Sequence, residues 1–307
     1  MTIAFVFPGQ GSQSIGMLAD LASDNAQVGE VFTEAADVLG YDLWNIVQNG
    51  PAERLNDTVV TQPAMLAAGV AIWRTWLSTG GAEPALMAGH SLGEYSALVC
   101  AGSLSFSSAM ELVKQRSQLM ADAVPAGDGA MAAVLGMEDE AVIQVCAAVS
   151  GTGVCEAVNF NSPGQVVIAG HREAVEQAVA EAKEQGARRA IVLPVSVPSH
   201  SSLMQGAGKE LAGHLDKTEF AVPTIPVVSS INAEIYRDAE QIRRQLSEQV
   251  FRPVRWVETI NAMTARGASR FVECGPGKVL TGLTRRIDRS LSGICVESPA
   301  TLAKAQE

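Results

Sequence analysis

The sequence has few aromatic residues, few cysteines and no long apolar run. Aromatic side chains make up 5% of the 307 residues and charged side chains 18%, whereas 47% of the residues are hydrophobic. This composition is typical of a globular chain that can form one large core or two linked domains. No apolar stretch approaches the ~18 residues that a membrane helix needs. We therefore expect no membrane contact.

The cysteines are too scattered to predict a cross-linked or metal-bound framework. None of them forms a Cys-x-x-Cys pair, so we expect neither disulfides nor a metal site. Reduced cysteines that pack as small hydrophobic side chains are the simpler interpretation. The five positions are Cys100, Cys146, Cys155, Cys274 and Cys295.

Positive charge is also scarce. The 22 basic residues stand against 33 acidic ones, for a net charge of −11, which argues against a nucleic-acid partner. An anionic ligand would need a local basic patch, such as Lys278 with Arg285 and Arg286. The N-terminal segment has no basic residues before its apolar run, so it predicts a first strand and not a signal peptide. We expect a cytoplasmic protein.

The outer parts of the sequence alternate β-rich runs with helical patterns. Strands are expected at 3–7 and 84–88, with a helix at 62–78 between them, and further strands at 227–230 and 270–273. Strand and helix alternation of this kind predicts an α/β protein with a parallel sheet flanked by helices.

The middle of the sequence has a different rhythm. The order of its expected elements, β-α-β-β-α-β, is that of a ferredoxin-like unit. We therefore predict a small domain at 127–195 inserted into a discontinuous catalytic domain at 1–126 and 196–307. The expected strands are 130–135, 154–160, 165–169 and 189–193, and the expected helices are 138–148 and 172–185.

Ser91 lies in the run Gly-His-Ser-Leu-Gly, between an apolar strand and a helix. Gly-x-Ser-x-Gly in that context predicts a nucleophile elbow, whose glycines permit the cramped turn. The N–H after the serine would then lie at a helix N-terminus, where negative charge is favoured. The alternative is an ordinary strand-to-helix turn with a capping serine.

A serine nucleophile needs a base, and the chain has four histidines. The side chain of His90 should point away from that of Ser91, His171 begins a helix of the small domain, and His214 lies in a charged run that looks exposed. Elimination leaves His200 as the candidate base, with a structural histidine as the alternative. The sequence identifies no aspartate or glutamate as the partner of this histidine. A backbone carbonyl could orient the imidazole instead.

Arg116 is the most informative residue for the substrate. It falls on the apolar stripe of a helix expected at 107–123, and therefore on the inward face. A buried guanidinium must be paired, and its donors suit a carboxylate. That carboxylate comes either from the ligand or from a protein acid.

Two glycine-containing loops follow expected strands but match no nucleotide-binding motif. The loop at 8–13 lacks the third glycine of a dinucleotide fingerprint, and Gly275-Pro276-Gly277-Lys278 lacks Walker spacing. The first loop is better interpreted as the source of a second oxyanion N–H.

Six ordered motifs resemble those of bacterial malonyl-CoA:acyl-carrier-protein transacylases, and the resemblance spans essentially the whole chain. It implies an α/β-hydrolase-like large domain with a ferredoxin-like insert. The motifs are PGQGSQ near the start, TQPA at 61–64, GHSLGEYSALVCAG at 89–102, NFNSPGQVVIAGH at 159–171, PVSVPSH at 194–200 and GPGKVLTGL at 275–283.

The resemblance also implies a role for each site residue. Ser91 would be acylated and His200 would be its base, with the backbone carbonyl of Gln249 orienting the imidazole. Arg116 would bind the malonyl carboxylate. The oxyanion hole would be formed by the backbone N–H groups of Gln10 and Leu92. The run Ser229-Ser230-Ile231-Asn232 departs from the expected Asn-rich pattern and puts local contacts near the cleft in question.

The function that follows is malonyl transfer from malonyl-CoA to the phosphopantetheine thiol of acyl carrier protein, for fatty-acid elongation. The resemblance implies a ping-pong mechanism, no bound cofactor and a monomer. One alternative is a serine hydrolase such as a thioesterase, with water as the acceptor. The other is a non-catalytic module that binds acyl carrier protein, which an intact Ser91 and His200 disfavour.

Overall fold

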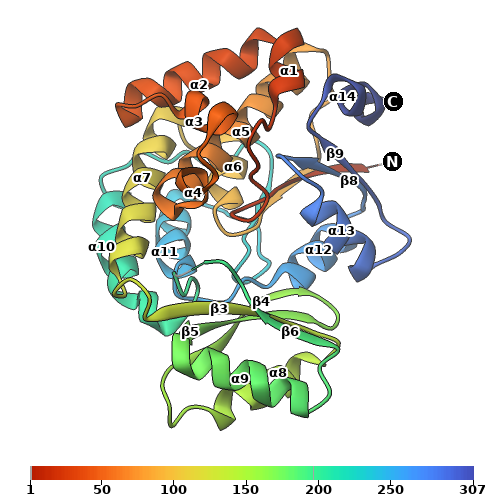
Figure 1. Ribbon diagram of the computed structural model, residues 1–307. Coiled ribbons are helices and arrows are strands. Elements are labelled where there is room, and N and C mark those ends of the chain that lie inside the picture. The colour runs from red at the N-terminus through yellow and green to blue at the C-terminus, as the bar shows by residue number, and fades with distance from the viewer. Residues whose placement is uncertain (1, 196) are drawn as a thin grey trace.

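Two sheets organise the molecule, and they lie in separate parts of it (Figure 1). The computed structural model describes residues 2–195 and 197–307. The five-stranded sheet takes its strands from the two ends of the sequence, and the four-stranded sheet takes its strands from the middle. The predicted fold class, an α/β protein with a parallel sheet and a smaller inserted unit, is confirmed.

The larger sheet is parallel throughout. Its order is β7 (Val227–Val228), β2 (Leu86–Gly89), β1 (Thr2–Phe7), β8 (Ala268–Cys274) and β9 (Ser292–Val296). Phe7 is in register with Gly89, so the carboxyl ends of β1 and β2 meet at one edge. Open parallel sheets present their ligand sites at such an edge.

Helices cover both faces of this sheet because β1 is apolar on both sides. Phe5 and Phe7 enter one hydrophobic cluster, and Ala4 and Val6 enter another. The first cluster includes side chains of α1 (Ala19–Asp24), α2 (Ala26–Leu39), α3 (Leu43–Asn49), α4 (Ala52–Asn56), α5 (Thr58–Ser78), α6 (Gly93–Cys100), α7 (Phe106–Asp122), α10 (Gln205–Leu215), α11 (Ala239–Gln249) and α14 (Pro299–Gln306). The second includes side chains of α12 (Trp256–Ala265) and α13 (Val279–Ile287).

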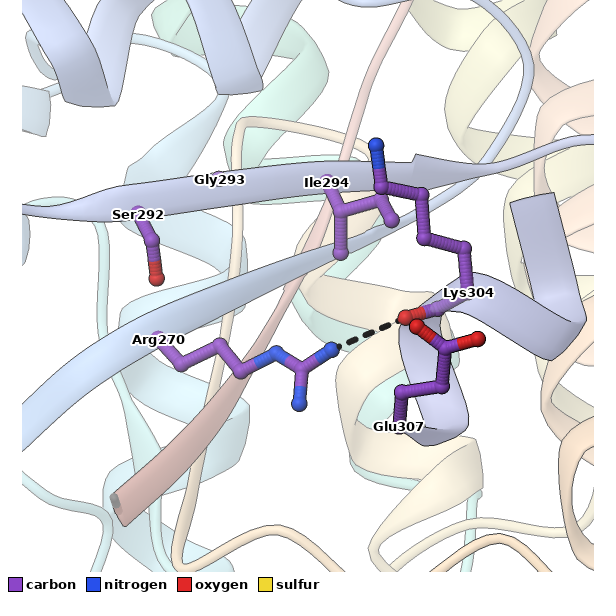
Figure 2. Close-up of a pocket in the computed structure, with 6 residues that line it drawn as sticks. All are labelled: Arg270, Ser292, Gly293, Ile294, Lys304 and Glu307. Carbon is purple, nitrogen blue, oxygen red and sulfur yellow. Dashed lines mark hydrogen bonds between the residues drawn. The ribbon is translucent and has the colours of Figure 1, made fainter.

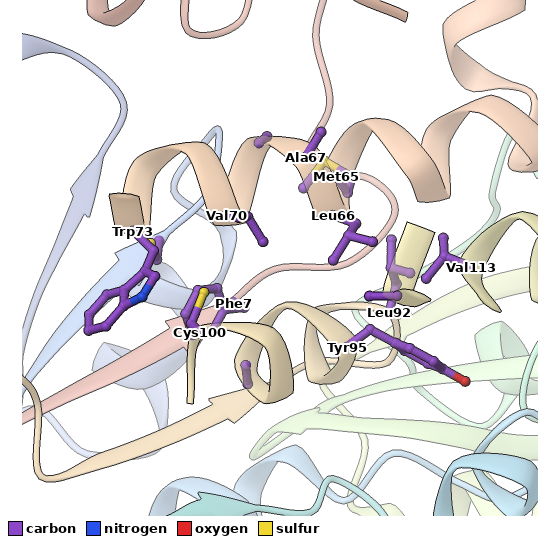
Figure 3. Close-up of a cluster of buried hydrophobic side chains, with 14 of the residues drawn as sticks. Phe7, Met65, Leu66, Ala67, Val70, Trp73, Leu92, Tyr95, Cys100 and Val113 are labelled. Carbon is purple, nitrogen blue, oxygen red and sulfur yellow. The ribbon is translucent and has the colours of Figure 1, made fainter. Parts of the chain in front are cut away.

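The helix α5 is buried along most of its length. Figure 3 shows Leu66 and Val70 of this helix in the same cluster as Leu92 and Tyr95, which belong to the turn after β2 and to α6. The side chain of Asp57 caps the helix by accepting a hydrogen bond from the Val59 N–H. The chain around residue 91 is therefore held against a rigid apolar layer.

The smaller sheet is antiparallel, in the order β4 (Cys155–Ser162), β5 (Gln165–His171), β3 (Gly129–Leu135) and β6 (Arg189–Val192). Its helices α8 (Asp139–Ala148) and α9 (Arg172–Glu184) pack on one face, on the far side from the large sheet (Figure 1). The order of elements is the predicted β-α-β-β-α-β. The domain boundaries themselves stay predictions, and residue 196 lies outside the described residues.

A short backbone pairing joins the two parts. The Phe160 N–H donates to the Val254 carbonyl at 2.9 Å, and the Val254 N–H donates to the Val158 carbonyl at 2.8 Å. This pairing attaches β4 to the segment between α11 and α12. A short 3₁₀ helix, Ser202–Met204, follows the return of the chain to the large part.

Candidate active site

Ser91 occupies a strained turn between β2 and α6. Its φ is 52°, in the left-handed region that few residues other than glycine adopt. A Cβ on Gly89 would lie 1.9 Å from the Gly93 carbonyl carbon, and one on Gly93 would lie 2.0 Å from the Phe7 carbonyl oxygen. Only glycine fits at either position. The turn has the form expected of a nucleophile elbow.

His200 lies beside Ser91, although it comes from a distant segment. Its Nε2 is 2.7 Å from the Ser91 Oγ, and its Nδ1 is 2.7 Å from the backbone carbonyl of Gln249. A carbonyl only accepts hydrogen bonds, so Nδ1 carries the proton and Nε2 presents its lone pair to the serine hydroxyl. The structure thus places a carbonyl where many serine enzymes place a carboxylate.

The other histidines are occupied elsewhere. The Nε2 of His90 is 2.8 Å from the Asn161 Oδ1, so its ring points away from the Ser91 hydroxyl as expected. The Nδ1 of His171 accepts a hydrogen bond from the Val154 N–H at 3.0 Å. His214 was expected to be exposed and is half-buried instead, because α10 packs against α7 and α11.

The His200 imidazole is neutral at physiological pH. Burial lowers its pKa, and the nearby Arg116 cation lowers it further, to about 3. The hydrogen bond to the Gln249 carbonyl opposes this shift only in part. A neutral imidazole can accept the serine proton, as a general base must.

Arg116 is buried on the inward face of α7, where its periodicity placed it. Its Nη2 donates to the Ser91 Oγ and to the Gln249 Oε1, each at 3.1 Å, and its Nη1 donates to the Gln62 Oε1. Its Nε has no partner within the described residues. No described carboxylate forms an ion pair with it. The Arg116 guanidinium therefore lies beside the Ser91 hydroxyl with neither an acidic partner nor a full set of hydrogen-bond acceptors.

The two backbone N–H groups expected to form an oxyanion hole belong to neighbouring turns. Leu92 immediately precedes α6, and a Cβ on Gly9 would lie 3.7 Å from the Leu92 nitrogen. Among the described residues, neither the Gln10 N–H nor the Leu92 N–H donates a hydrogen bond. The Gln10 side chain is held by the Thr58 hydroxyl at 3.0 Å.

Three buried side chains at the site were not assigned from their type in the sequence. The amides of Gln62 and Gln249 accept from Arg116, and the carboxylate of Glu94 lies behind Gln249. Gln62 and Glu94 fall inside TQPA and GHSLGEYSALVCAG, two of the motifs that carry the family resemblance, which is the only signal that pointed to them. Ser230 lies in the run that differs from the expected Asn-rich pattern. It donates to Glu94 through both its N–H and its hydroxyl.

The second glycine-containing loop is a strand-to-helix turn, between β8 and α13. A Cβ on Gly275 would lie 2.2 Å from the Pro8 Cγ, so this loop packs against the one that carries Gln10. Lys278 forms an exposed ion pair with Glu297 at 3.8 Å.

A hollow between β9 and α14 lies away from this site. Several of its residues come from the amino-terminal parts of β8 and β9, whereas Ser91 follows the carboxyl end of β2. It is lined by Arg270, Ser292, Gly293, Ile294, Lys304 and Glu307 (Figure 2).

The described residues form neither a metal-binding cluster nor a membrane-spanning helix. Over residues 2–195 and 197–307, no three histidine, cysteine, aspartate or glutamate side chains are grouped so that they could hold a metal ion. In the same part of the chain, no helix has the length and apolar character needed to cross a membrane.

Comparison with known proteins places the chain in a family. The model of the acyl transferase domain matches residues 4–302. The malonyl CoA-acyl carrier protein transacylase of Salmonella typhimurium is 53% identical over 302 residues, which cover 98% of each chain. That of Escherichia coli K12 is 52% identical over 304 residues, which cover 99% of this chain and 98% of the relative.

Solved structures agree with this placement. An acyl carrier protein S-malonyltransferase from Vibrio cholerae is 55% identical, with a TM-score of 0.96 over 99% of each chain. A malonyl-transacylase in complex with a type II PKS acyl-carrier protein is 53% identical, with a TM-score of 0.98 over 100% of this chain and 99% of that one. The chain therefore belongs to the malonyl CoA-acyl carrier protein transacylase family of acyltransferases.

Proposed function

We propose that this acyltransferase moves the malonyl group of malonyl-CoA to the phosphopantetheine thiol of acyl carrier protein, through a malonyl ester on Ser91. The observation that carries the proposal is the position of Arg116. Its buried guanidinium lies 3.1 Å from the Ser91 Oγ and has no described acid as a partner. A substrate carboxylate next to the serine would supply the missing charge, and a guanidinium is well suited to donate to it.

In the first half of the reaction, His200 takes the proton of the Ser91 hydroxyl through Nε2, and Oγ attacks the thioester carbonyl. The geometry already supports this transfer, because the two atoms are 2.7 Å apart and the Gln249 carbonyl keeps Nδ1 protonated. The tetrahedral intermediate collapses as the C–S bond breaks, and His200 returns the proton to the leaving CoA thiolate. The product is malonyl-Ser91.

In the second half, the thiol of acyl carrier protein takes the place of CoA. His200 accepts the thiol proton, the thiolate attacks the ester carbonyl, and the Ser91 oxygen leaves with that proton. The N–H groups of Gln10 and Leu92 would stabilise the oxyanion in both halves. Each such donor contributes about 2.7–4 kcal/mol to transition-state stabilisation.

This chemistry uses side chains and backbone groups of the chain itself. Malonyl-CoA enters as a substrate and acyl carrier protein as the acceptor, so no resident cofactor has a step to perform. The cytoplasmic location and the monomeric state expected from the sequence stay predictions.

The test is intact-mass measurement after incubation with malonyl-CoA. We expect a malonyl adduct that is absent in Ser91→Ala and is discharged when holo acyl carrier protein is added. Rapid loss of the adduct to free malonate without carrier protein would indicate a hydrolase. The absence of any adduct would indicate a binding module. Either of these results overturns the proposal.

A further inference from the structure

Glu94 is a fully buried carboxylate that the proposed mechanism does not use. It lies in the first turn of α6, three residues after Ser91, and is 0% exposed. No described lysine or arginine forms an ion pair with it. Burying an isolated carboxylate is costly unless hydrogen bonds compensate. Its position therefore calls for a structural or functional reason.

Four uncharged groups donate hydrogen bonds to this carboxylate. The Ser230 N–H at 3.3 Å and the Tyr236 hydroxyl at 2.6 Å donate to Oε1. The Ser230 hydroxyl at 2.7 Å and the Gln249 Nε2 donate to Oε2. Burial raises the pKa of the Glu94 carboxyl, and the hydrogen bonds from Tyr236, Ser230 and Gln249 oppose that rise. An ionised carboxylate accepts only, so the four converging donors define its orientation.

The Gln249 side chain connects this carboxylate to the active site. Its Nε2 donates to Glu94 and, at 3.0 Å, to the Ser91 carbonyl, whereas its Oε1 accepts from Arg116 at 3.1 Å. The backbone carbonyl of the same residue holds His200. Gln249 thus contacts the candidate nucleophile, the candidate base and the candidate carboxylate-binding residue.

The orientation of this amide matters because its two ends are not equivalent. Turned over, it would present NH₂ to the Arg116 guanidinium, and two donors would face each other. Glu94 accepts from Nε2 and so prevents that orientation. The intervening amide also keeps Glu94 from pairing with Arg116 directly, which leaves guanidinium donors free for a ligand.

We infer that Glu94 is a positioning residue for acyl-group selection: it fixes the Gln249 amide, which in turn aims Arg116 at the site of the malonyl carboxylate. The inference rests on the proposed function. It predicts that loss of the Glu94 charge weakens the recognition of a carboxylate-bearing acyl group more than the chemistry at Ser91. An acetyl group has no carboxylate and needs no aligned Arg116.

The test compares the single-turnover acylation of Ser91 by malonyl-CoA and by acetyl-CoA in Glu94→Gln, followed by intact mass. We expect the ratio of the two acylation rate constants, malonyl over acetyl, to fall about ten-fold or more, with the acetyl rate kept within about three-fold. In an Arg116→Ala background, the same change should not lower the ratio further, because the two residues act in series.

Glu273→Gln is the matched control. Glu273 is also fully buried, and its carboxylate accepts hydrogen bonds from the N–H groups of Leu280 at 2.9 Å and Thr281 at 2.7 Å. Unlike Glu94, it forms no hydrogen bond with Gln249. The Glu273→Gln substitution should leave the ratio of malonyl to acetyl acylation rates unchanged. If Glu94→Gln does not fold, Glu94→Asp withdraws the carboxylate from Gln249 while keeping its charge, and the ratio should again fall.

An unchanged ratio in a folded Glu94 variant, with both rates intact or both reduced in parallel, overturns the inference. Failure of the proposed function gives a different result. In that case the protein with Glu94 intact already forms no malonyl adduct, or loses the adduct rapidly to free malonate without carrier protein.

Discussion

The Ser91 hydroxyl accepts a hydrogen bond from the buried Arg116 guanidinium at 3.1 Å. Ser91 lies in the turn between β2 and α6, whereas Arg116 lies on α7, and both α6 and α7 pack against α5. A cation this close to a nucleophile fixes where a negatively charged acyl group can be placed. It also lowers the pKa of the neighbouring His200, so substrate selection and base strength depend on the same residue.

Replacement of Arg116 by alanine should separate malonyl from acetyl transfer. Hydrogen bonds to charged groups contribute about 1.5–3 kcal/mol, so we expect malonyl transfer to fall about 10- to 100-fold. Acetyl transfer should be retained or increased, because no carboxylate needs binding. The measurement is kcat/KM for each donor, with circular dichroism to verify folding. Equal loss with both donors would mean that Arg116 is a structural residue.

The same variant should change the pH dependence of acetyl transfer. Burial and the Arg116 cation lower the pKa of His200 to about 3, so the unmodified protein should stay active well below pH 6. Removal of the cation raises this pKa toward the ordinary value near 6.5. The acid limb of the kcat/KM profile should therefore move to higher pH in Arg116→Ala. Superimposable acid limbs in the two proteins would contradict the assignment of His200 as the base.

Stability should decline in mild acid partly because of His200. The pKa is lowered in the folded state, so below pH 6.5 the unfolded chain binds a proton that the folded chain does not. Between pH 7 and 5 this difference amounts to about 2 kcal/mol of lost stability. Urea denaturation of the unmodified protein and of His200→Gln at both pH values measures it.

The variant should lose about 2 kcal/mol less than the unmodified protein over this interval. Burial also lowers the pKa of His90, but that residue contributes equally in both proteins. Identical losses would show that His200 can be protonated in the folded state.

Gly93→Ala should damage both the fold and the site. The added Cβ would lie 2.0 Å from the Phe7 carbonyl oxygen, and overpacking of this kind costs about 1–3 kcal/mol. The matched control is Gly213→Ala in α10, where a Cβ meets nothing within 4 Å. Alanine should be neutral there or stabilising by up to about 1 kcal/mol. Thermal melts provide the comparison, and similar Tm values for the two variants would rule out the tight elbow.

Local patterns in the sequence predicted much of this protein. The two glycines around Ser91, together with an apolar strand before them, indicated the elbow. The 3.6-residue period placed Arg116 on the buried face of its helix, and the order of strands and helices predicted the inserted unit. Each of these features depends on a few adjacent residues, because backbone conformation and helix faces are set at that range.

Other elements had weaker local signals. The helices α1–α4 and the strand β9 were among those not assigned individually. α1, α3 and α4 are too short to establish a helical period, whereas α2 does carry one, in Val28, Val31, Phe32, Ala35 and Leu39, and was missed. β7 contains two residues where four were expected. A two-residue strand exists because Met87 and Ala88 of β2 offer it a partner, which is a tertiary circumstance.

The sequence by itself determined which residues could carry the chemistry: a serine in an elbow, the one histidine that elimination left as a base, and an inward-facing arginine. Only the tertiary structure decided how they are held. Gln249 reaches the Ser91 carbonyl across 158 positions, and Ser230 reaches Glu94 across 136. No local pattern encodes such pairings, because they arise only when the end of α11 and the turn after β7 lie beside α6 and the buried polar groups must satisfy one another.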